Sequence, residues 1–184
     1  AFPLAAVTQR PMAMYHSWDS QNAWLRQIHT HNYLFVNAAT ARAQGIEDGG
    51  WMWVESPWGK VRCMARHSEA VEPGTVWTWN AIGKAAGAWN LEPNANESKQ
   101  GFLLNHVISE ELPAHDAGAH VSNSDPITGQ AAWYDVRVRL YKAGDDEEKV
   151  SWPQFDPVPS APGTPARRLW QSYFAGKFTR KGDQ

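Results

Sequence analysis

Alternation of apolar and polar residues predicts several short strands along the chain. In the clearest of them, residues 132–142, Val136, Val138 and Leu140 alternate with two arginines, which is the pattern of a strand with one buried face. The other predicted strands lie at residues 3–9, 33–36 and 74–80, and a strand–turn–strand unit covers residues 46–71.

The pattern predicts few helices, and they are short. Asp19 is expected to cap a helix over residues 20–28, and Asn37 a second helix over residues 38–44 that Gly45 ends in the left-handed conformation. Weaker helical patterns occupy residues 81–89 and 101–112. Short strands with inserted helices, in strand–helix–strand–strand order, are typical of a β-barrel.

A change of character at residue 144 divides the chain. Residues 1–143 form the predicted barrel domain, whereas residues 144–184 are first charged and then rich in proline. Because proline lacks a backbone N–H, this tail cannot pair freely in a sheet, and we expect an extended segment that wraps a surface. A short terminal helix is predicted to begin at Pro165.

Composition and charge exclude several classes of protein. The 184 residues are 42% hydrophobic and 20% charged, as in a globular domain. A net charge of −2 argues against a general nucleic-acid binder, because affinity for the phosphate backbone needs a basic excess. No apolar run approaches the roughly twenty residues of a membrane helix, so no direct membrane insertion is expected.

The single cysteine, Cys63, permits neither an internal disulfide nor a cluster ligated by this chain, and it is predicted to be a small buried residue.

Familiar catalytic and metal-binding motifs are missing from the sequence. It contains no G-x-S-x-G elbow, no G-x-G-x-x-G turn and no Walker loop. His16, Ser17 and Asp19 are the residue types of a hydrolase triad, but adjacent Ser and His side chains on one segment usually point apart. His29 and His31 would supply only two metal ligands, which make a poor site.

Two polar stretches remain as candidates for a binding site. Residues 8–28 combine arginines, a histidine and amides with Trp18 and Trp24. Residues 122–134 contain a strong turn at 123–126 and run into the last predicted strand through two aromatic residues. A decorated hairpin loop and a ligand-presenting loop both fit the composition of the second stretch.

Four motifs follow one another along the chain: TQRP…YHS from residue 8, NYLFVNAATARAQGIEDGGWMWVESPWGKV from residue 32, EPGTVW from residue 72 and NSDPITGQAAWYDVRV from residue 123. In this order they resemble the C-terminal domain of molybdopterin oxidoreductases, the dimethyl sulfoxide reductase family, over about residues 2–141. The resemblance implies a mainly β fold, a six-stranded double-psi β-barrel of the aspartate-decarboxylase-like kind, with inserted short helices and an extended C-terminal tail.

The resemblance also implies a cofactor, molybdopterin guanine dinucleotide in its bis form, with molybdenum or tungsten held by the rest of the parent enzyme. A guanidinium suits a pyrophosphate or a pterin, a His followed by a hydroxyl residue would lie over the pterin, and an amide suits a heterocycle edge. Some relatives carry a lysine at the position of Tyr134, so this chain lacks a charged contact there. The implied cofactor-binding residues are Arg10, His16, Ser17, Asn22, Asn123, Asp125, Trp133 and Tyr134.

In this family the metal ligand and the iron–sulfur cluster belong to earlier domains. The missing initiator Met and the missing cysteines therefore lead us to expect a C-terminal part of a larger catalytic subunit, with a separately encoded subunit as the alternative. Such a domain binds the cofactor without turning over substrate itself. The motifs most resemble subunits that act on a sulfur oxyanion such as sulfite, thiosulfate or polysulfide. The implied partners are the remaining domains and an iron–sulfur electron-transfer subunit, in bacterial cytoplasm or periplasm.

Two alternatives remain open. A double-psi barrel can serve as a protein-interaction or substrate-recognition module without a cofactor, whereas a cofactor domain should gather Arg10, His16, Asn123 and Tyr134 around one cleft. A self-contained decarboxylase-like enzyme would need a self-processing serine, for which the sequence offers no convincing position.

Tryptophans make up 11 of the 184 residues. We expect Trp18, Trp24 and Ile28 to be scaffold. Trp51, Trp53 and Trp58 are expected to cover other domains of the parent enzyme, which would leave apolar patches on the isolated chain.

Overall fold

The computed structural model describes residues 2–15, 18–19, 22–80, 96–102, 107–108, 111–115, 119–122, 124–125, 127–130, 136–147, 149 and 154–155. The strands in these ranges are β1 (Leu4–Gln9), β2 (Tyr33–Val36), β3 (Trp51–Ser56), β4 (Gly59–His67), β5 (Thr75–Trp79), β6 (Glu111–His115), β7 (Ala119–Ser122), β8 (Val136–Lys142) and β9 (Gln154–Phe155). The helices are α1 (Ala23–Ile28), α2 (Ala38–Ala43) and α3 (Asn96–Lys99).

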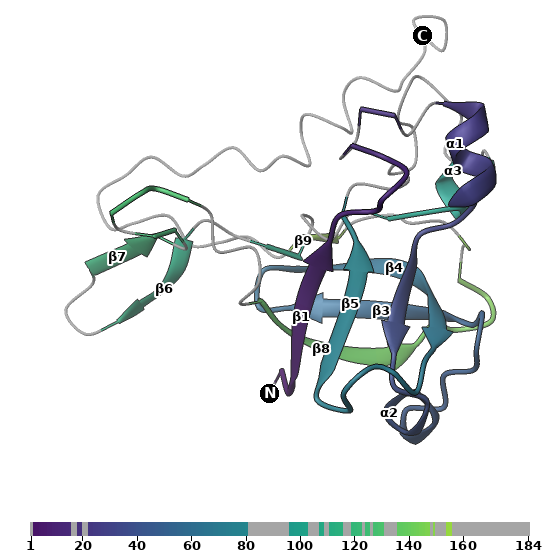
Figure 1. Ribbon diagram of the computed structural model, residues 1–184. Coiled ribbons are helices and arrows are strands. Elements are labelled where there is room, and N and C mark those ends of the chain that lie inside the picture. Colours follow the sequence, from purple (N-terminus) through teal and green to yellow (C-terminus); the bar gives the residue numbers. More distant parts are fainter. Residues whose placement is uncertain are drawn as a thin grey trace, which may run out of the picture.

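Six strands close into a barrel in the order β2-β5-β1-β8-β3-β4, and β4 pairs back onto β2 (Figure 1). The pairs β1–β5 and β2–β4 are parallel, and the remaining four contacts around the barrel are antiparallel. This closed, mixed, six-stranded barrel with few short helices confirms the predicted fold class.

The barrel interior is filled by the apolar positions that alternate along the strands. Burying one such side chain contributes roughly 1.5–3 kcal/mol relative to leaving it exposed, so this alternation supplies most of the drive to fold. Cys63 is 2% exposed and burial raises the pKa of its thiol, as expected for a small core residue. The core includes Leu4, Ala6, Leu34, Val36, Met52, Val54, Val61, Cys63, Ala65, Val76, Val136, Val138 and Leu140.

Helix α2 forms as predicted. The Asn37 side chain accepts a hydrogen bond from the N–H of Ala39, and Gly45 has a φ of 66° just beyond the helix. Helix α1 begins later than predicted, at Ala23, and its N-cap is Asn22 rather than Asp19. Asp19 instead shapes the preceding turn, because its carboxylate and carbonyl accept from the N–H groups of Tyr15 and Asn22.

The predicted helix over residues 101–112 is wrong at its end. Glu111 and Leu112 lie in β6, which pairs with β7 to form a separate two-stranded sheet. Pairing with β7 satisfies backbone groups that a short helix would have left open at its terminus. The helices predicted at residues 81–89 and from Pro165 lie outside the described residues.

The start of the predicted tail is fastened to the barrel through Glu147. Its Oε2 atom accepts hydrogen bonds from the indole Nε1 of Trp53 at 2.8 Å and from the N–H of Gly144 at 3.1 Å. The same oxygen lies 3.8 Å from the buried guanidinium of Arg62. Two further residues of the tail form β9 beside Gly59 and Lys60 of β4. The division at residue 143 stays a prediction, and the tail begins in contact with the barrel.

The prediction that Trp53 covers a neighbouring domain is wrong. Its side chain is only 3% exposed and lies within this chain. Arg62 and Lys60 lie over its ring, 4.4 and 4.7 Å from the centroid. Cation–π contact and the hydrogen bond to Glu147 therefore use both the face and the edge of this indole.

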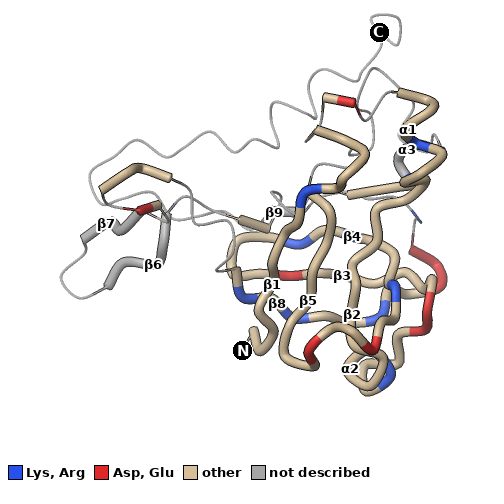
Figure 2. Tube along the Cα trace, viewed as in Figure 1, with Lys and Arg blue, Asp and Glu red and all other residues tan. Residues whose placement is uncertain are grey.

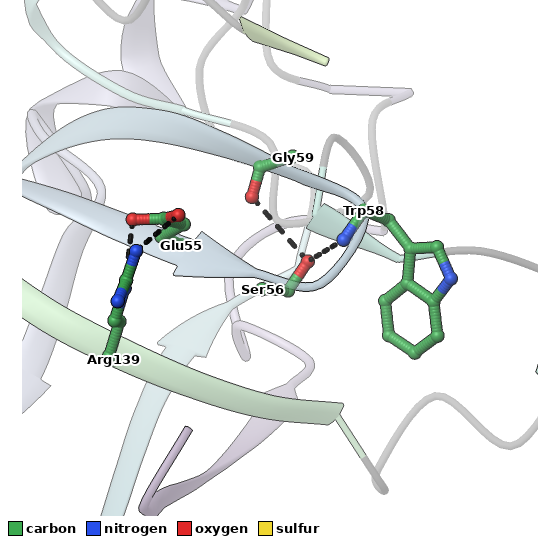
Figure 3. Close-up of polar contacts among 5 residues, drawn as sticks. All are labelled: Glu55, Ser56, Trp58, Gly59 and Arg139. Atoms are coloured by element: carbon green, nitrogen blue, oxygen red, sulfur yellow. Dashed lines mark hydrogen bonds and ion pairs between the residues drawn. The ribbon is translucent and has the colours of Figure 1, made fainter. Parts of the chain in front are cut away.

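Ser56 and Glu55, at the end of β3, make polar contacts within the β3–β4 hairpin and across to β8 (Figure 3). The buried Ser56 hydroxyl accepts from the N–H of Trp58 at 3.2 Å and donates to the carbonyl of Val107 at 2.6 Å. Next to it, Glu55 accepts two hydrogen bonds from Arg139 of β8, at 2.7 and 3.0 Å. Arg139 holds the pKa of Glu55 below its usual range, and burial with Glu55 nearby raises the pKa of Tyr141 to about 12.

The Glu55–Arg139 pair predicts a pH-dependent stability difference. A carboxylate whose pKa is lowered on folding stabilises the folded state above its ordinary pKa, and this contribution disappears as pH falls through the lowered value. Glu55→Gln should therefore be less stable than wild type at pH 7 and equally stable in strong acid, measured by urea unfolding across pH. The exposed Glu69→Gln is the control, and a difference that persists in acid would contradict the ion pair as the cause.

Candidate functional site

The candidate site lies at the end of the barrel where β1 and β5 both finish. These strands are parallel, so their last residues, Gln9 and Trp79, are register partners. The N–H of Asn80 donates to the carbonyl of Gln9 at 2.8 Å, which ties the two strand ends together. Arg10 follows β1 directly and is exposed. Its guanidinium has no ion-pair partner among the described residues, so it is available to an anion.

The buried side-chain amide of Asn32 connects the strands and the loop at this end of the barrel. Asn32 is 2% exposed, and its Nδ2 donates to the carbonyls of Trp79 at 3.0 Å and Phe102 at 3.3 Å. Its Oδ1 accepts from the buried hydroxyl of Thr78 at 2.9 Å. Because the donors and acceptors are satisfied mutually, the network specifies one arrangement of β2, β5 and the residues around 102.

Sequence reasoning missed this network. Asn32 opens the second motif and Thr78 stands between two tryptophans, but neither residue carried a predicted role. The available signal was a polar residue at an inward position of a strand that is otherwise apolar.

Helix α1 lies beside this end of the barrel (Figure 1). The Asn22 Oδ1 caps it by accepting from the N–H groups of Trp24 at 3.0 Å and Leu25 at 3.4 Å. Capping occupies the amide oxygen, which leaves the Nδ2 group for any ligand. Just after the helix, the His29 ring lies 5.4 Å from the ring of Trp79, which joins α1 to β5.

A pocket of about 330 Å³ lies between α1 and α3. Five of its six lining residues are polar or charged, but the exposed lining surface is slightly more apolar than polar, so the pocket indicates no particular class of ligand. The lining residues are Ala23, Arg26, Gln27, Thr30, Asn96 and Gln100.

The second predicted stretch contains a self-contained turn around Asp125. Its Oδ1 accepts from the N–H of Thr128 at 2.7 Å, the hydroxyl of Thr128 at 2.9 Å and the N–H of Ile127 at 3.0 Å. The hydrogen bonds from Thr128 contribute most to lowering the pKa of this carboxyl group. Gly129, with a φ of 69°, closes the turn by donating to the carbonyl of Asp125. Asp125 thus organises its own loop.

Of the eight predicted cofactor-binding residues, the structure describes three. Arg10 and Asn22 belong to the segment that runs from the end of β1 into α1. Asp125 follows β7, and Figure 1 shows the β6–β7 hairpin on the side of the barrel away from α1. The remaining five lie outside the described residues, so the gathering of both stretches around one cleft stays a prediction. These five are His16, Ser17, Asn123, Trp133 and Tyr134.

The scaffold role expected for three apolar residues is wrong. Trp18, Trp24 and Ile28 are 74%, 79% and 65% exposed. Helix α1 has no buried residue, and Leu25 and Arg26 are its half-buried positions. The exposed apolar surface that was expected from the hairpin tryptophans is found here instead.

The described residues contain neither a metal-binding cluster nor a membrane-spanning helix. No group of three His, Cys, Asp or Glu side chains is placed to hold a metal ion in these ranges. The described helices are also too short to cross a bilayer.

Residues 4–118 match the family described as the molydopterin dinucleotide binding domain. This match covers more than half of the chain, so the chain belongs to that family, and the predicted class of cofactor is confirmed. The match contains the end of β1, α1 and the Asn32 network.

The chain is also similar in sequence to individual proteins of known name. A sulfite dehydrogenase subunit of Allochromatium vinosum is 70% identical over 181 residues, which are 98% of this chain and 19% of that protein. Dopamine dehydroxylase of Eggerthella lenta is 28% identical over 89% of this chain and 14% of its own length. The thiosulfate reductase molybdopterin-containing subunit of Salmonella typhimurium is 28% identical over 54% of this chain and 13% of its own length. The chain thus spans less than a fifth of these relatives.

A solved structure supports the fold. Acetylene hydratase from Pelobacter acetylenicus superposes with a TM-score of 0.55 at 19% identity, over 77% of this chain and 18% of that one.

The Asp125 turn yields a prediction about local order. Asp125→Ala removes the acceptor of three hydrogen bonds, so amide hydrogen exchange at Ile127 and Thr128 should become several-fold faster. Asp125→Asn keeps an acceptor at the same place and should stay close to wild type. Equal acceleration in both variants would show that the negative charge, rather than the turn geometry, is the essential feature.

Proposed function

We propose that this chain is the molybdopterin guanine dinucleotide-binding domain of a larger molybdenum oxidoreductase subunit that acts on a sulfur oxyanion, with sulfite as the first candidate. The observation that carries the proposal is the 70% identity to the sulfite dehydrogenase subunit over nearly the whole chain. The similarity to a thiosulfate reductase subunit supports the same substrate class. A double-psi barrel without a cofactor is disfavoured by the family membership.

The described residues fit such a cofactor. A dinucleotide carries a pyrophosphate, and Arg10 offers an exposed guanidinium at the end of β1. Asn22 retains its Nδ2 donor after capping α1, which suits an acceptor on a heterocycle edge. When bound, the cofactor supplies the metal centre that exchanges electrons or an oxygen atom with the substrate.

Further contacts follow from the resemblance to the family. His16 and Ser17 would lie over the pterin, and Asn123, Trp133 and Tyr134 would approach it from the second stretch. Asp125 would shape the loop that presents them. The proposed role of the domain is to bind and orient the cofactor and to exclude water, while the remaining domains supply the metal ligand.

The proposed assembly contains further subunits. Relatives such as the sulfite dehydrogenase protein bear the names of subunits of larger enzymes. We infer an iron–sulfur subunit as the electron-transfer partner, because a two-electron sulfur reaction needs an outlet for its electrons and this chain has only the one buried cysteine.

Substrate specificity can be tested on the full-length subunit, purified with its partner subunits and cofactor. We expect sulfite-dependent reduction of an artificial electron acceptor and no catechol dehydroxylation. The cofactor-free preparation is the control. Activity with thiosulfate or polysulfide instead of sulfite would correct the substrate within its class. Catechol dehydroxylation, the reaction class suggested by the name of the Eggerthella relative, would overturn the class itself.

The role of Arg10 can be tested by cofactor retention. Loss of one charge-assisted hydrogen bond costs about 2 kcal/mol, which corresponds to more than tenfold in affinity. Arg10→Ala in the full-length subunit should therefore lower the pterin content of the purified protein, measured by fluorescence after denaturation, and Arg10→Lys should lose less. The matched control is Arg42→Ala in α2, an exposed arginine at the other end of the barrel (Figure 1). An unchanged pterin content in Arg10→Ala would remove Arg10 from the site.

A further inference from the structure

Asn32 joins three segments of the chain through four hydrogen bonds. Its Nδ2 group donates to the carbonyls of Trp79 at 3.0 Å and Phe102 at 3.3 Å. Its Oδ1 atom accepts from the hydroxyl of Thr78 at 2.9 Å, and its backbone N–H donates to the carbonyl of Gln100 at 2.7 Å. Asn32 therefore connects the start of β2 with the end of β5 and with the segment that follows α3.

Stability alone does not require polar side chains at these two positions. Asn32 and Thr78 are 2% and 0% exposed, and they alternate with the buried apolar residues Leu34 and Val76. A buried amide or hydroxyl is costly unless it finds a partner, and its hydrogen bonds form in one arrangement only. The hydroxyl hydrogen of Thr78 is shared with the carbonyl of Tyr33 at 3.0 Å, so both of its nearest acceptors lie at the start of β2. The polar pair thus has a consequence that an apolar pair would lack, which is a fixed position for the end of β5.

The same network reaches the backbone of Arg10 through two peptide groups. The carbonyl of Trp79, which Asn32 holds, and the N–H of Asn80 belong to one planar peptide group. That N–H donates to the carbonyl of Gln9 at 2.8 Å, and this carbonyl belongs to the peptide group that ends at the nitrogen of Arg10. Two planar groups joined by a hydrogen bond thus connect the buried amide with Arg10.

Arg10 stands at the point where this fixed backbone ends. Its side chain is exposed, and Figure 2 shows a basic position directly beyond the end of β1. A guanidinium binds a phosphate strongly when its planar fork meets the oxygens at a matching place and angle. Because the side chain is long and flexible, a fixed backbone lowers the entropy that is lost when the contact forms. The position of the Arg10 backbone should therefore influence how tightly the contact holds.

We infer that Asn32 and Thr78 are positioning residues, which hold the backbone of Arg10 where its guanidinium meets a phosphate of the bound dinucleotide. This inference rests on the proposed function. Neither residue needs to touch the cofactor, because both act through the end of β5 and Gln9. The competing explanation is that the two residues only stabilise the barrel, in which case retention of the cofactor should follow stability.

Two substitutions of Thr78 test the inference in the full-length subunit, purified with its cofactor and partner subunits. Thr78→Val keeps the shape of the side chain but removes the hydroxyl, which leaves the Asn32 Oδ1 atom without this donor. We expect its pterin content to fall several-fold below that of wild type, though less than in Arg10→Ala. Thr78→Ser keeps the hydroxyl and should retain nearly the wild-type content.

A variant of equal stability separates positioning from stabilisation. Ile46 is 1% exposed and follows α2 at the other end of the barrel (Figure 1). Ile46→Val or Ile46→Ala, whichever matches Thr78→Val in melting temperature, should keep the wild-type pterin content. An equal loss of pterin in the matched variant would show a purely structural role. If Thr78→Val does not accumulate, Thr78→Ala removes the same hydroxyl and takes its place.

The double variant Arg10→Ala/Thr78→Val tests whether Thr78 acts through Arg10. If it does, the double variant should retain as much pterin as Arg10→Ala alone, because the contact that Thr78 positions is already absent. Losses that multiply would overturn the inference and leave the two residues with separate roles.

The outcomes separate this inference from the proposed function. A wild-type pterin content in Thr78→Val, together with a loss in Arg10→Ala, would overturn the positioning role and leave the proposed function standing. An unchanged content in Arg10→Ala would remove Arg10 from the site and the positioning role with it. A wild-type subunit that carries no pterin would overturn the proposed function itself.

Discussion

The parallel pairing of β2 with β4 closes the barrel, and the other features depend on that closure. Without it, both strands would present open edges and the alternating apolar residues would have no enclosed interior. Closure sets a tight space, which is filled by valines together with small residues such as Ala6, Cys63 and Ala65. It also brings the ends of β1 and β5 together at one rim of the barrel, where a ligand can meet backbone and side chains from segments far apart in the sequence.

At that rim, a network of buried residues lies next to residues that are exposed. The buried Asn32–Thr78 network fixes the strand ends, and a satisfied buried amide allows little variation in their geometry. Beside it, Arg10 is exposed and α1 has no buried residue. This arrangement suits a cofactor-binding domain, because the fixed strand ends determine where a ligand lies and the exposed residues beside them are accessible to it.

Where the predicted tail leaves the barrel, by contrast, side chains and backbone are joined by several contacts. There Glu147 joins Trp53, Arg62 and the backbone of Gly144, and β9 adds to β4. These contacts are made within the chain. Among the described residues, the chain is therefore closely packed around the β3–β4 hairpin, whereas α1 has no buried side chain.

The sequence by itself determined the six barrel strands, the α2 cap at Asn37, the turn at Asp125 and the family, because alternation, capping residues and ordered motifs are local signals, but it missed β6, β7 and β9. It could not place the cap of α1, because Asp19 and Asn22 are both good caps and the preceding turn decides between them. It also predicted Trp53 on the surface and Trp18 and Trp24 in the scaffold. Only the tertiary structure decided these, because the burial of an aromatic side chain depends on which distant groups, here Glu147, Arg62 and Lys60, can satisfy its edge and faces.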